Sequence, residues 1–306
     1  MPEQNTITQQ DRMYELIVGD YKSGDGVRIT DLQMSFDVSL SADNKRDSSS
    51  ASVQIYNLSR ETLRLLETDF LTCSLKAGYR QIGIYEIING NVVEVVTRRQ
   101  GADKVTTLTI GESFSSLNHK RVKAVVAPGK SKVEIIEEIR KKMDGVSRGA
   151  YEGKRLNETI PYGYPLHGTP KEMLTRFARE NRLEWRIVNG VLYVSEENGI
   201  IDKNTEDVPL ISKSSGLIDI PYYSSGESTK LDSDKTRKQG VVFTALLNPT
   251  VQPGRLLKLD SEVMQALSGF YRVNDIKYSG DYRGNDWYME CFCSKVDGVT
   301  LANINK

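Results

Sequence analysis

The stretch DLQMSFDVSL, from Asp31 to Leu40, alternates between polar and apolar side chains at every position. Successive side chains of a β-strand point to opposite faces, so this pattern predicts a strand with one buried and one solvated face. Such strands are typical of antiparallel sheets, because parallel sheets are covered on both faces and read as continuous apolar runs. The chain is therefore expected to begin with antiparallel β structure.

The rest of the first region continues this pattern. After a polar stretch at 41–52, the segment VQIYNL repeats the alternation, which predicts a hairpin with a long tip. Ser59 is placed to cap a short helix. The dipeptide Asn89-Gly90 lies between apolar runs and predicts another hairpin. Residues 1–120 are thus expected to form an antiparallel barrel or sandwich with one helix.

Between 121 and 208 the sequence carries two strong helix starts. Ser131 with Glu134, and Thr169 with Glu172, have the spacing of a capping box, in which the two side chains bond each other's backbone amides. Both pairs precede segments expected to be helical, and the second segment is amphipathic, with Met173, Leu174, Phe177 and Ala178 at helical spacing. We expect a compact α+β module here.

Strands return towards the end of the chain. The module finishes with a hairpin signal at Asn189-Gly190. Within 209–306, the polar segment 213–240 is expected to be a loop, and the segments after it supply four to five strands separated by proline and glycine turns. The predicted fold class is mainly β with an α+β insertion, in which two antiparallel β-barrels flank the small α+β module.

Composition points to protein partners. Lys plus Arg and Asp plus Glu are balanced at 41 each, so no overall field attracts nucleic acid or an anionic membrane. No run approaches the roughly 18 apolar residues of a membrane span, and the N-terminus has no signal-peptide core. We expect synthesis in a cytoplasm, no membrane partner and no sequence-specific nucleic-acid partner.

Cysteine and histidine give little material for a reactive or metal site. The three cysteines, Cys73, Cys291 and Cys293, fit neither a disulfide framework nor a zinc motif, and the last two share a strand face suited to core packing. His119 and His167 have no acidic or cysteine neighbour at ligand spacing. We therefore expect no metal, no cofactor and no catalytic site.

The segment AVVAPGKSKVEIIEEIRKKM, which starts at Ala124, comes close to a phosphate-binding loop, G-x-x-x-x-G-K-[ST]. Alanine takes the place of the first glycine, which serves conformations that a Cβ disfavours. The strands here are joined by hairpins, and no apolar run after Met143 could supply the magnesium-binding acid. Helix capping by Ser131 explains the segment better than nucleotide binding does.

The sequence gives only weak support for a serine nucleophile, a glycosidase site or a nucleic-acid-binding surface. GESFS, at 111–115, lacks the closing glycine of a nucleophile elbow. The carboxylates Asp275, Asp281 and Asp286 could serve a glycosidase but are more typical of turns. Short basic clusters are interpreted as solvated faces, and the aromatic C-terminal segment, which could stack single strands, places Trp287 on a core face.

The last hundred residues carry a family resemblance. Four turn and strand elements appear in the order Leu247-Asn248-Pro249, Pro253-Gly254, Gly280-Asp281 and Trp287-Tyr288. Near the N-terminus, FDVSL is followed by ASVQIYNLS and a short helix. This order resembles the baseplate hub proteins of tailed bacteriophages, over essentially the whole chain.

The resemblance implies a structural protein of the virion. Its barrels would be tail-tube-like, and three copies would form a homotrimeric ring of six-fold appearance that joins the tail tube protein to the central spike protein, beside other baseplate proteins. The polar stretches 41–52 and 213–240 would be contact arms. Because the chain stops at Lys306, without the lysozyme or spike domain of some members, no lytic activity is expected.

Two alternatives remain open at the level of sequence. One is another tail component, a distal tail or tube-initiator protein with six-fold stoichiometry. The other is a peptidoglycan-cleaving enzyme that uses loop carboxylates. The phage, the tail type and the residues that line the channel are not specified by the sequence.

Overall fold

A computed structural model gives the structure of the chain. It describes residues 9, 11–20, 26–42, 49–67, 71–111, 121–143, 145–188, 190–197, 199–201, 208–224 and 240–296. The predicted polar tip at 43–48, most of the segment 213–240, and the residues Glu112 to Ser115 of the elbow-like motif lie outside these ranges, as does His119.

The N-terminal region is built of strands around one short helix. Its elements are β1 (Arg12–Asp20), β2 (Gly26–Ile29), β3 (Met34–Ser41), β4 (Ser50–Tyr56), α1 (Arg60–Leu66), β5 (Leu71–Tyr79), β6 (Gly83–Gln100) and β7 (Asp103–Gly111). The hairpin of β3 and β4 and the helix capped by Ser59, whose hydroxyl accepts from the amide of Thr62, are both confirmed.

The middle region carries the helices. Its elements are β8 (Val122–Val126), β9 (Lys130–Ser131), α3 (Lys132–Arg140), β10 (Ser147–Glu152), the 3-10 turn η1 (Lys154–Asn157), β11 (Thr159–Ile160), β12 (Tyr164–Gly168), α4 (Pro170–Asn181), β13 (Leu183–Val188) and β14 (Val191–Glu196). Both predicted capping boxes are formed. The hairpin at Asn189-Gly190 is confirmed, since Val188 pairs with Val191.

The C-terminal region returns to strands. Its elements are β15 (Leu210–Ile211), η2 (Lys213–Ser215), β16 (Tyr222–Ser224), β17 (Gly240–Leu246), β18 (Leu256–Leu259), η3 (Gln265–Leu267), β19 (Gly269–Asp281) and β20 (Trp287–Lys295). Part of the expected loop 213–240 is thus structured, because β16 adds to the edge of the sheet beside β17.

One large sheet unites the two β regions. The order of its strands is β16-β17-β20-β19-β3-β4-β7-β6-β5-β1-β2, and β18 links β15 to β19. All its pairings are antiparallel except that of β15 with β18. The mainly β fold with an α+β insertion is confirmed, and among the described strands the sheet does not close into a barrel.

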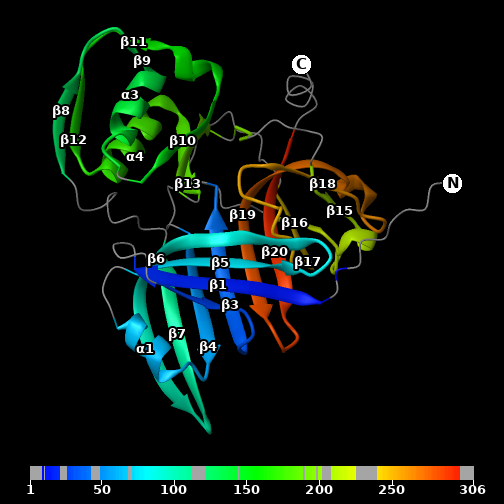
Figure 1. The fold of residues 1–306 in the computed structure, drawn as a ribbon. Coiled ribbons are helices and arrows are strands. Elements are labelled where there is room, and N and C mark those ends of the chain that lie inside the picture. The colour runs from blue at the N-terminus through cyan, green and yellow to red at the C-terminus, as the bar shows by residue number, and fades with distance from the viewer. Residues whose placement is uncertain are drawn as a thin grey trace.

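The sheet folds over on itself to make a core. In Figure 1, β1, β5 and the first half of β6 cross in front of β3, β4 and β7. The crossing follows from β6, which pairs with β5 as far as Asn91 and with β7 from Asn91 onward. Side chains of the N-terminal and C-terminal regions share one hydrophobic core. The middle module has a separate core around Ile135, Phe177 and Trp185.

The predicted hairpin at Asn89-Gly90 is wrong. These residues lie inside the continuous strand β6, and the turn to β7 comes at 101–102. A Cβ at Gly90 would overlap the backbone of Gly111 on β7. The glycine therefore permits a close approach of two strands, which is a second common use of glycine within strands.

Candidate functional site: the concave face and the ends of the sheet

An internal repeat organises the large sheet. In the N-terminal region four neighbouring strands follow the order β3-β4-β7-β6, and in the C-terminal region the order is β16-β17-β20-β19. Each set begins with an antiparallel pair and ends with a long strand that also pairs outside the set, β6 with β5 and β19 with β18. We call these sets the N-repeat and the C-repeat.

The two long strands match in detail. β6 has a bulge at Val93 where it pairs with β7, and β19 has one at Asn274 where it pairs with β20. Aligning the bulges places Glu94 at the position of Asp275 and Thr97 at that of Tyr278. A bulge bends a strand and increases its local twist. The long strand of each repeat therefore bends at the equivalent residue.

The repeats meet at a single strand pair, β3 with β19. Register runs from Asp275 opposite Ser41 to Asp281 opposite Ser35. The rings of Phe36 and Trp287 contact each other edge to face across this joint, with their centroids 5.4 Å apart. Phe36 also covers Gly280, where a Cβ would overlap its ring. The joint is a packed part of the core.

A second contact fixes the joint from the N-terminal strand. The Arg12 guanidinium of β1 donates to the backbone carbonyls of Asp281, Gly284 and Asn285, at 2.7–3.0 Å. These carbonyls belong to the end of β19 and the turn that follows it. Because β1 belongs to the N-terminal region, this clamp ties that region to the turn between β19 and β20 of the C-repeat.

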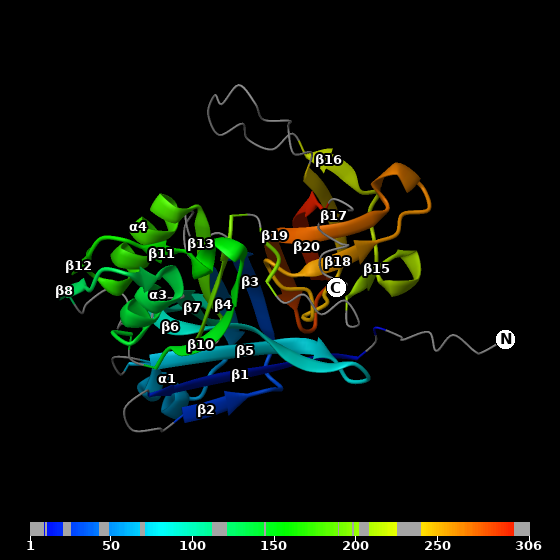
Figure 2. The same ribbon diagram turned by 90° about the horizontal axis from the view of Figure 1, so that it is seen from above.

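Opposite the core, the sheet has a concave outer face. A groove of about 490 Å³ is lined by residues of six successive strands, from Ser50 on β4 to Tyr222 on β16. Residues so far apart in a sheet can share one groove only if the sheet curves around it. In Figure 2, the strands from β7 through β3 and β19 to β16 follow one another across the molecule, with β5, β1 and β2 to one side.

The concave face differs between the two repeats, with hydroxyl groups frequent on the N-repeat and apolar, aromatic and charged side chains on the C-repeat. Register places the serines of β3 and β4 and two threonines of β7, Thr107 and Thr109, on it. Val242 and Phe292 of the C-repeat share this face with charged residues of β19 and β20. Acidic side chains outnumber basic ones among the residues that register assigns to this face: Asp37, Glu94, Asp275, Asp281 and Glu290 against Arg98 and Lys277. The charged residues on this face therefore carry a small excess of negative charge.

The middle module is anchored to the C-repeat through buried charges. Arg272 of β19 donates to the Glu184 carboxylate of β13 at 2.5 Å, and both side chains are almost fully buried. The same guanidinium donates to the carbonyl of Gly199 and to the amide oxygen of Asn274, the bulge residue. One network of hydrogen bonds thus holds the middle module against the bulge of β19 in the C-repeat.

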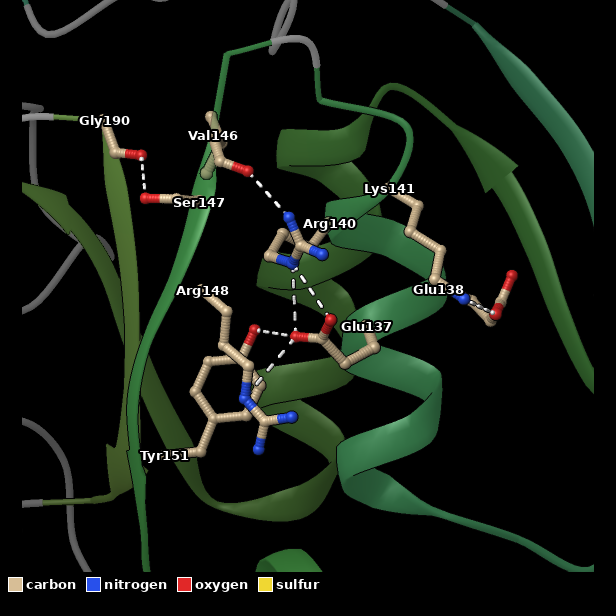
Figure 3. A network of polar contacts seen from close by, with 9 residues as sticks. All are labelled: Glu137, Glu138, Arg140, Lys141, Val146, Ser147, Arg148, Tyr151 and Gly190. Carbon is tan, nitrogen blue, oxygen red and sulfur yellow. Dashed lines mark hydrogen bonds and ion pairs between the residues drawn. The ribbon is translucent and has the colours of Figure 1, made fainter.

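Inside the module, a polar network joins α3 to β10 (Figure 3). The Glu137 carboxylate accepts from the hydroxyl of Tyr151 at 2.6 Å and from Nε of Arg140, and lies 4.0 Å from Nε of Arg148. Arg140 also donates to the carbonyl of Val146. The carboxylate thus lies beside a hydroxyl donor and two arginines, and Arg140 has acceptors on both sides. The network therefore stabilises the module and does not resemble a reactive site.

The segment that resembled a phosphate loop is a capped helix start. The amide of Ser131 donates to the Glu134 carboxylate and the amide of Lys132 to the carbonyl of Glu158. The hydrogen bond from Lys130 holds the pKa of Glu134 at about 2, so this carboxylate is an anion at neutral pH. The amides and the lysine that would bind a phosphate are already bonded within the protein.

The structure separates Asp275 from the other two candidate carboxylates, Asp281 and Asp286. Asp275 and Asp281 lie six residues apart on β19, which separates them by roughly 20 Å at the usual rise of a strand. Asp281 accepts from Gln33 and from the amide of Gly284, as a turn residue does. Asp286 follows in the same turn. Asp275 therefore cannot pair with Asp281 as the acid and base of a glycosidase, whereas Asp281 and Asp286 serve as residues of one turn.

The remaining candidates are core or surface residues. Cys73, Cys291 and Cys293 are buried, and burial raises the pKa of each thiol. Trp287 is 1% exposed, so it packs in the core and is not available for stacking on bases. His167 lies on β12. Within the described residues there is no cluster of three potential metal ligands and no helix long and apolar enough to cross a membrane.

Comparison of the sequence with known protein families gives a match. A sequence model of the family described as baseplate hub gp41 matches residues 56–293. No curated protein sequence matches the chain.

Solved structures show the same fold at low sequence identity. The tail protein from Neisseria meningitidis MC58 superposes with a TM-score of 0.63 at 12% identity, over 94% of this chain and 98% of its own. The 43 kDa tail protein of prophage MuSo2 from Shewanella oneidensis gives 0.61 at 11%, over 92% and 98%. An E. coli component of the type VI secretion system gives 0.60 at 9%, over 87% and 74%.

Proposed function

The chain belongs to the baseplate hub gp41 family, and we propose that it is the structural hub of a phage tail, with no catalytic activity. In this proposal three copies form a ring of six-fold appearance that joins the tail tube to the central spike. The hub resides in the virion baseplate, and its copies assemble in the host cytoplasm before the tail is complete.

The internal repeat is the observation that carries the proposal. One chain supplies two similar four-stranded sets in a single curved sheet, so three chains supply six sets. At the usual strand spacing of ~4.8 Å, roughly 24 strands would enclose a cylinder about 37 Å across between backbones. A ring of this kind matches a six-fold tube with only three subunits.

The concave face suits the wall of the channel. Lys and Arg hold nucleic acid by contacts to phosphate, and acidic groups repel it. The hydroxyl groups of the N-repeat and the excess of Asp and Glu among the charged residues of this face would let a polyanion slide past without binding it. We propose that this face lines the passage through which the genome leaves the particle.

The other surfaces would serve neighbouring proteins. The tube protein and the central spike would contact the two rims of the ring, and other baseplate proteins would contact the middle module. The division into residues 1–120, 121–208 and 209–306 is part of this proposal, with the outer two regions forming the ring and the middle one standing on it.

Solution mass and ring symmetry test the proposal. The purified chain is expected to have three times the 34.4 kDa mass of one copy, and electron microscopy of the particles should show rings with three-fold symmetry. Six copies per ring would favour a distal tail or tube-initiator protein. Clearing of host cell walls in a turbidity assay, lost on replacing Asp275, Asp281 and Asp286 by alanine, would favour the enzymatic alternative.

A further inference from the structure

Both ends of the curved sheet are left open in a single copy. At one end lies β16, which pairs with β17 on one side. At the other lies the second half of β6, from Val92 to Gln100, which pairs with β7 on one side. Among the described residues, no strand pairs with the opposite side of either segment. A strand edge of this kind is a template for pairing with another chain.

We infer that β16 of one copy pairs with the second half of β6 in the next copy. This inference rests on the proposed ring and specifies the contact that closes it. The internal repeat supplies the argument, because β16 is the first strand of the C-repeat and β6 is the last of the N-repeat. Within the chain, the first strand of the N-repeat, β3, already pairs with the last strand of the C-repeat, β19. The joint between copies would repeat the joint within one.

Burial at equivalent positions supports this pairing. Val38 on β3 and Tyr223 on β16 occupy the same place in their repeats, on the core side of the sheet. Val38 is 0% exposed because β19 lies beside it, whereas Tyr223 is 48% exposed. On the other strand, Tyr278 of β19 is 1% exposed, while its equivalent Thr97 on β6 is exposed. Each end therefore exposes a side chain that the internal joint buries.

The register of the internal joint transfers to the new one. Lys277 opposite Ser39 becomes Val96 opposite Ser224, and Tyr278 opposite Val38 becomes Thr97 opposite Tyr223. The next pair in this register places Arg98 opposite Tyr222.

That last pair is chemically favourable. Arg98 and Tyr222 both lie on the concave side, and Tyr222 is 56% exposed in the single copy. A guanidinium beside a tyrosine ring makes a cation–π contact. Ile220, which is 57% exposed in the segment leading into β16, extends the apolar surface that a second copy would cover.

The partner is a second copy of this chain, since both halves of the joint are present on one polypeptide. The two open ends are different strands, so the contact is head to tail, which is the kind of contact that generates rings. The matching bulges at Val93 and Asn274 give the two strands the same bend. A second copy therefore offers an edge already shaped to fit.

Cysteine cross-linking tests the predicted register. The variant Val96→Cys with Ser224→Cys should form disulfides between copies on mild oxidation, giving dimers and trimers on non-reducing gels. Cys73, Cys291 and Cys293 are buried and can remain in place. The internal pair Ser39→Cys with Lys277→Cys is the positive control, because those residues face each other within one chain. The pair Thr97→Cys with Ser224→Cys is the negative control, because the two side chains would lie on opposite faces of the sheet.

A second variant tests the contact without oxidation. Tyr223→Asp should lower the proportion of trimer at least tenfold at a concentration where the wild type is intact. Tyr85→Asp changes a side chain of similar exposure, 47%, in the first half of β6 and should leave the trimer unchanged.

The outcomes separate this inference from the proposed function. A trimeric wild type that forms the internal disulfide but no cross-links from Val96→Cys with Ser224→Cys would overturn the strand pairing and leave the hub proposal standing. Equal cross-linking of the opposite-face pair would overturn the register. A monomeric wild type would overturn both.

Discussion

The joint between β3 and β19 and the two open ends of the same sheet are built from equivalent strands, yet they differ in what they bury. At the joint, Phe36, Val38 and Tyr278 are enclosed. At the ends, Tyr223 and Thr97 take equivalent places and face solvent. The comparison teaches that the stability of a single copy depends on the joint, whereas the chemistry available to partners is concentrated at the ends.

The largest effect is expected where the joint meets the middle module. Arg272→Met removes the cation beside the buried Glu184 carboxylate, and breaking a buried pair costs about 4 kcal/mol of unfolding free energy. The double variant Arg272→Met with Glu184→Leu should recover much of this loss, because the carboxylate is then gone. Urea unfolding followed by the fluorescence of Trp185 and Trp287 measures it. Equal losses in the single and double variants would contradict the explanation.

Truncation of equivalent residues tests the comparison directly. Tyr278→Ala should cost about 3 kcal/mol, since it removes a buried ring together with the hydroxyl that donates to the carbonyl of Val251. Thr97→Ala, at the open end, removes a hydrogen bond between the hydroxyls of Thr97 and Thr106 but no buried ring, and should cost only about 1 kcal/mol. Both are measured by urea unfolding under conditions that keep the chain monomeric. Similar losses at the two positions would break the distinction between joint and ends.

Replacing the glycine at the joint should have an intermediate effect on stability. Gly280→Ala places a methyl group against the ring of Phe36, and overpacking of this kind costs roughly 1–3 kcal/mol. The equivalent residue at the open end is Arg99, whose side chain is exposed, so Arg99→Ala should be nearly neutral. The midpoint of thermal unfolding distinguishes the two variants. A neutral Gly280→Ala would mean that Phe36 can move aside.

The smallest effect is expected in how the unfolding free energy changes on acidification. Glu15 of β1 bonds Lys76, and this bond together with nearby Arg28 lowers the pKa of the carboxyl below its ordinary 4.5. A lowered pKa stabilises the fold above the ordinary value, and this contribution is lost as the pH falls through the folded-state pKa. Glu15→Gln should therefore be less stable than the wild type at pH 7 and lose less stability on acidification. Unfolding midpoints between pH 7 and 3 measure the difference, and identical slopes would refute it.

Local signals in the sequence predicted much of the fold. The alternation from Asp31 to Leu40 marked β3, and the caps at Ser59, Ser131 and Thr169 marked three helices. These features depend on a few neighbouring residues, so they can be read without the tertiary structure. The order of turns near the C-terminus also gave the family, because turn chemistry is set by the residues of the turn itself.

Non-local pairing was not predictable in this way. Asn89-Gly90 and Asn189-Gly190 carry the same hairpin signal, yet only the second falls between two strands that pair with each other, β13 and β14. The first lies inside β6, where Gly90 lets the backbone of β7 come close. The joint of β3 with β19 unites segments more than two hundred residues apart, and nothing in either segment alone specifies the other. β16 was missed because it is three residues long and has no alternation to detect.

The two ends of the sheet are different strands, and this difference determines when the addition of copies stops. Two molecules joined head to tail still present one unused edge at each extremity, so the contact offers no stopping point at a pair. Only closure ends the growth, and closure depends on the curvature that the Arg12 clamp and the two bulges impose. A substitution that flattened the sheet while sparing its edges would convert a finite particle into an open-ended filament.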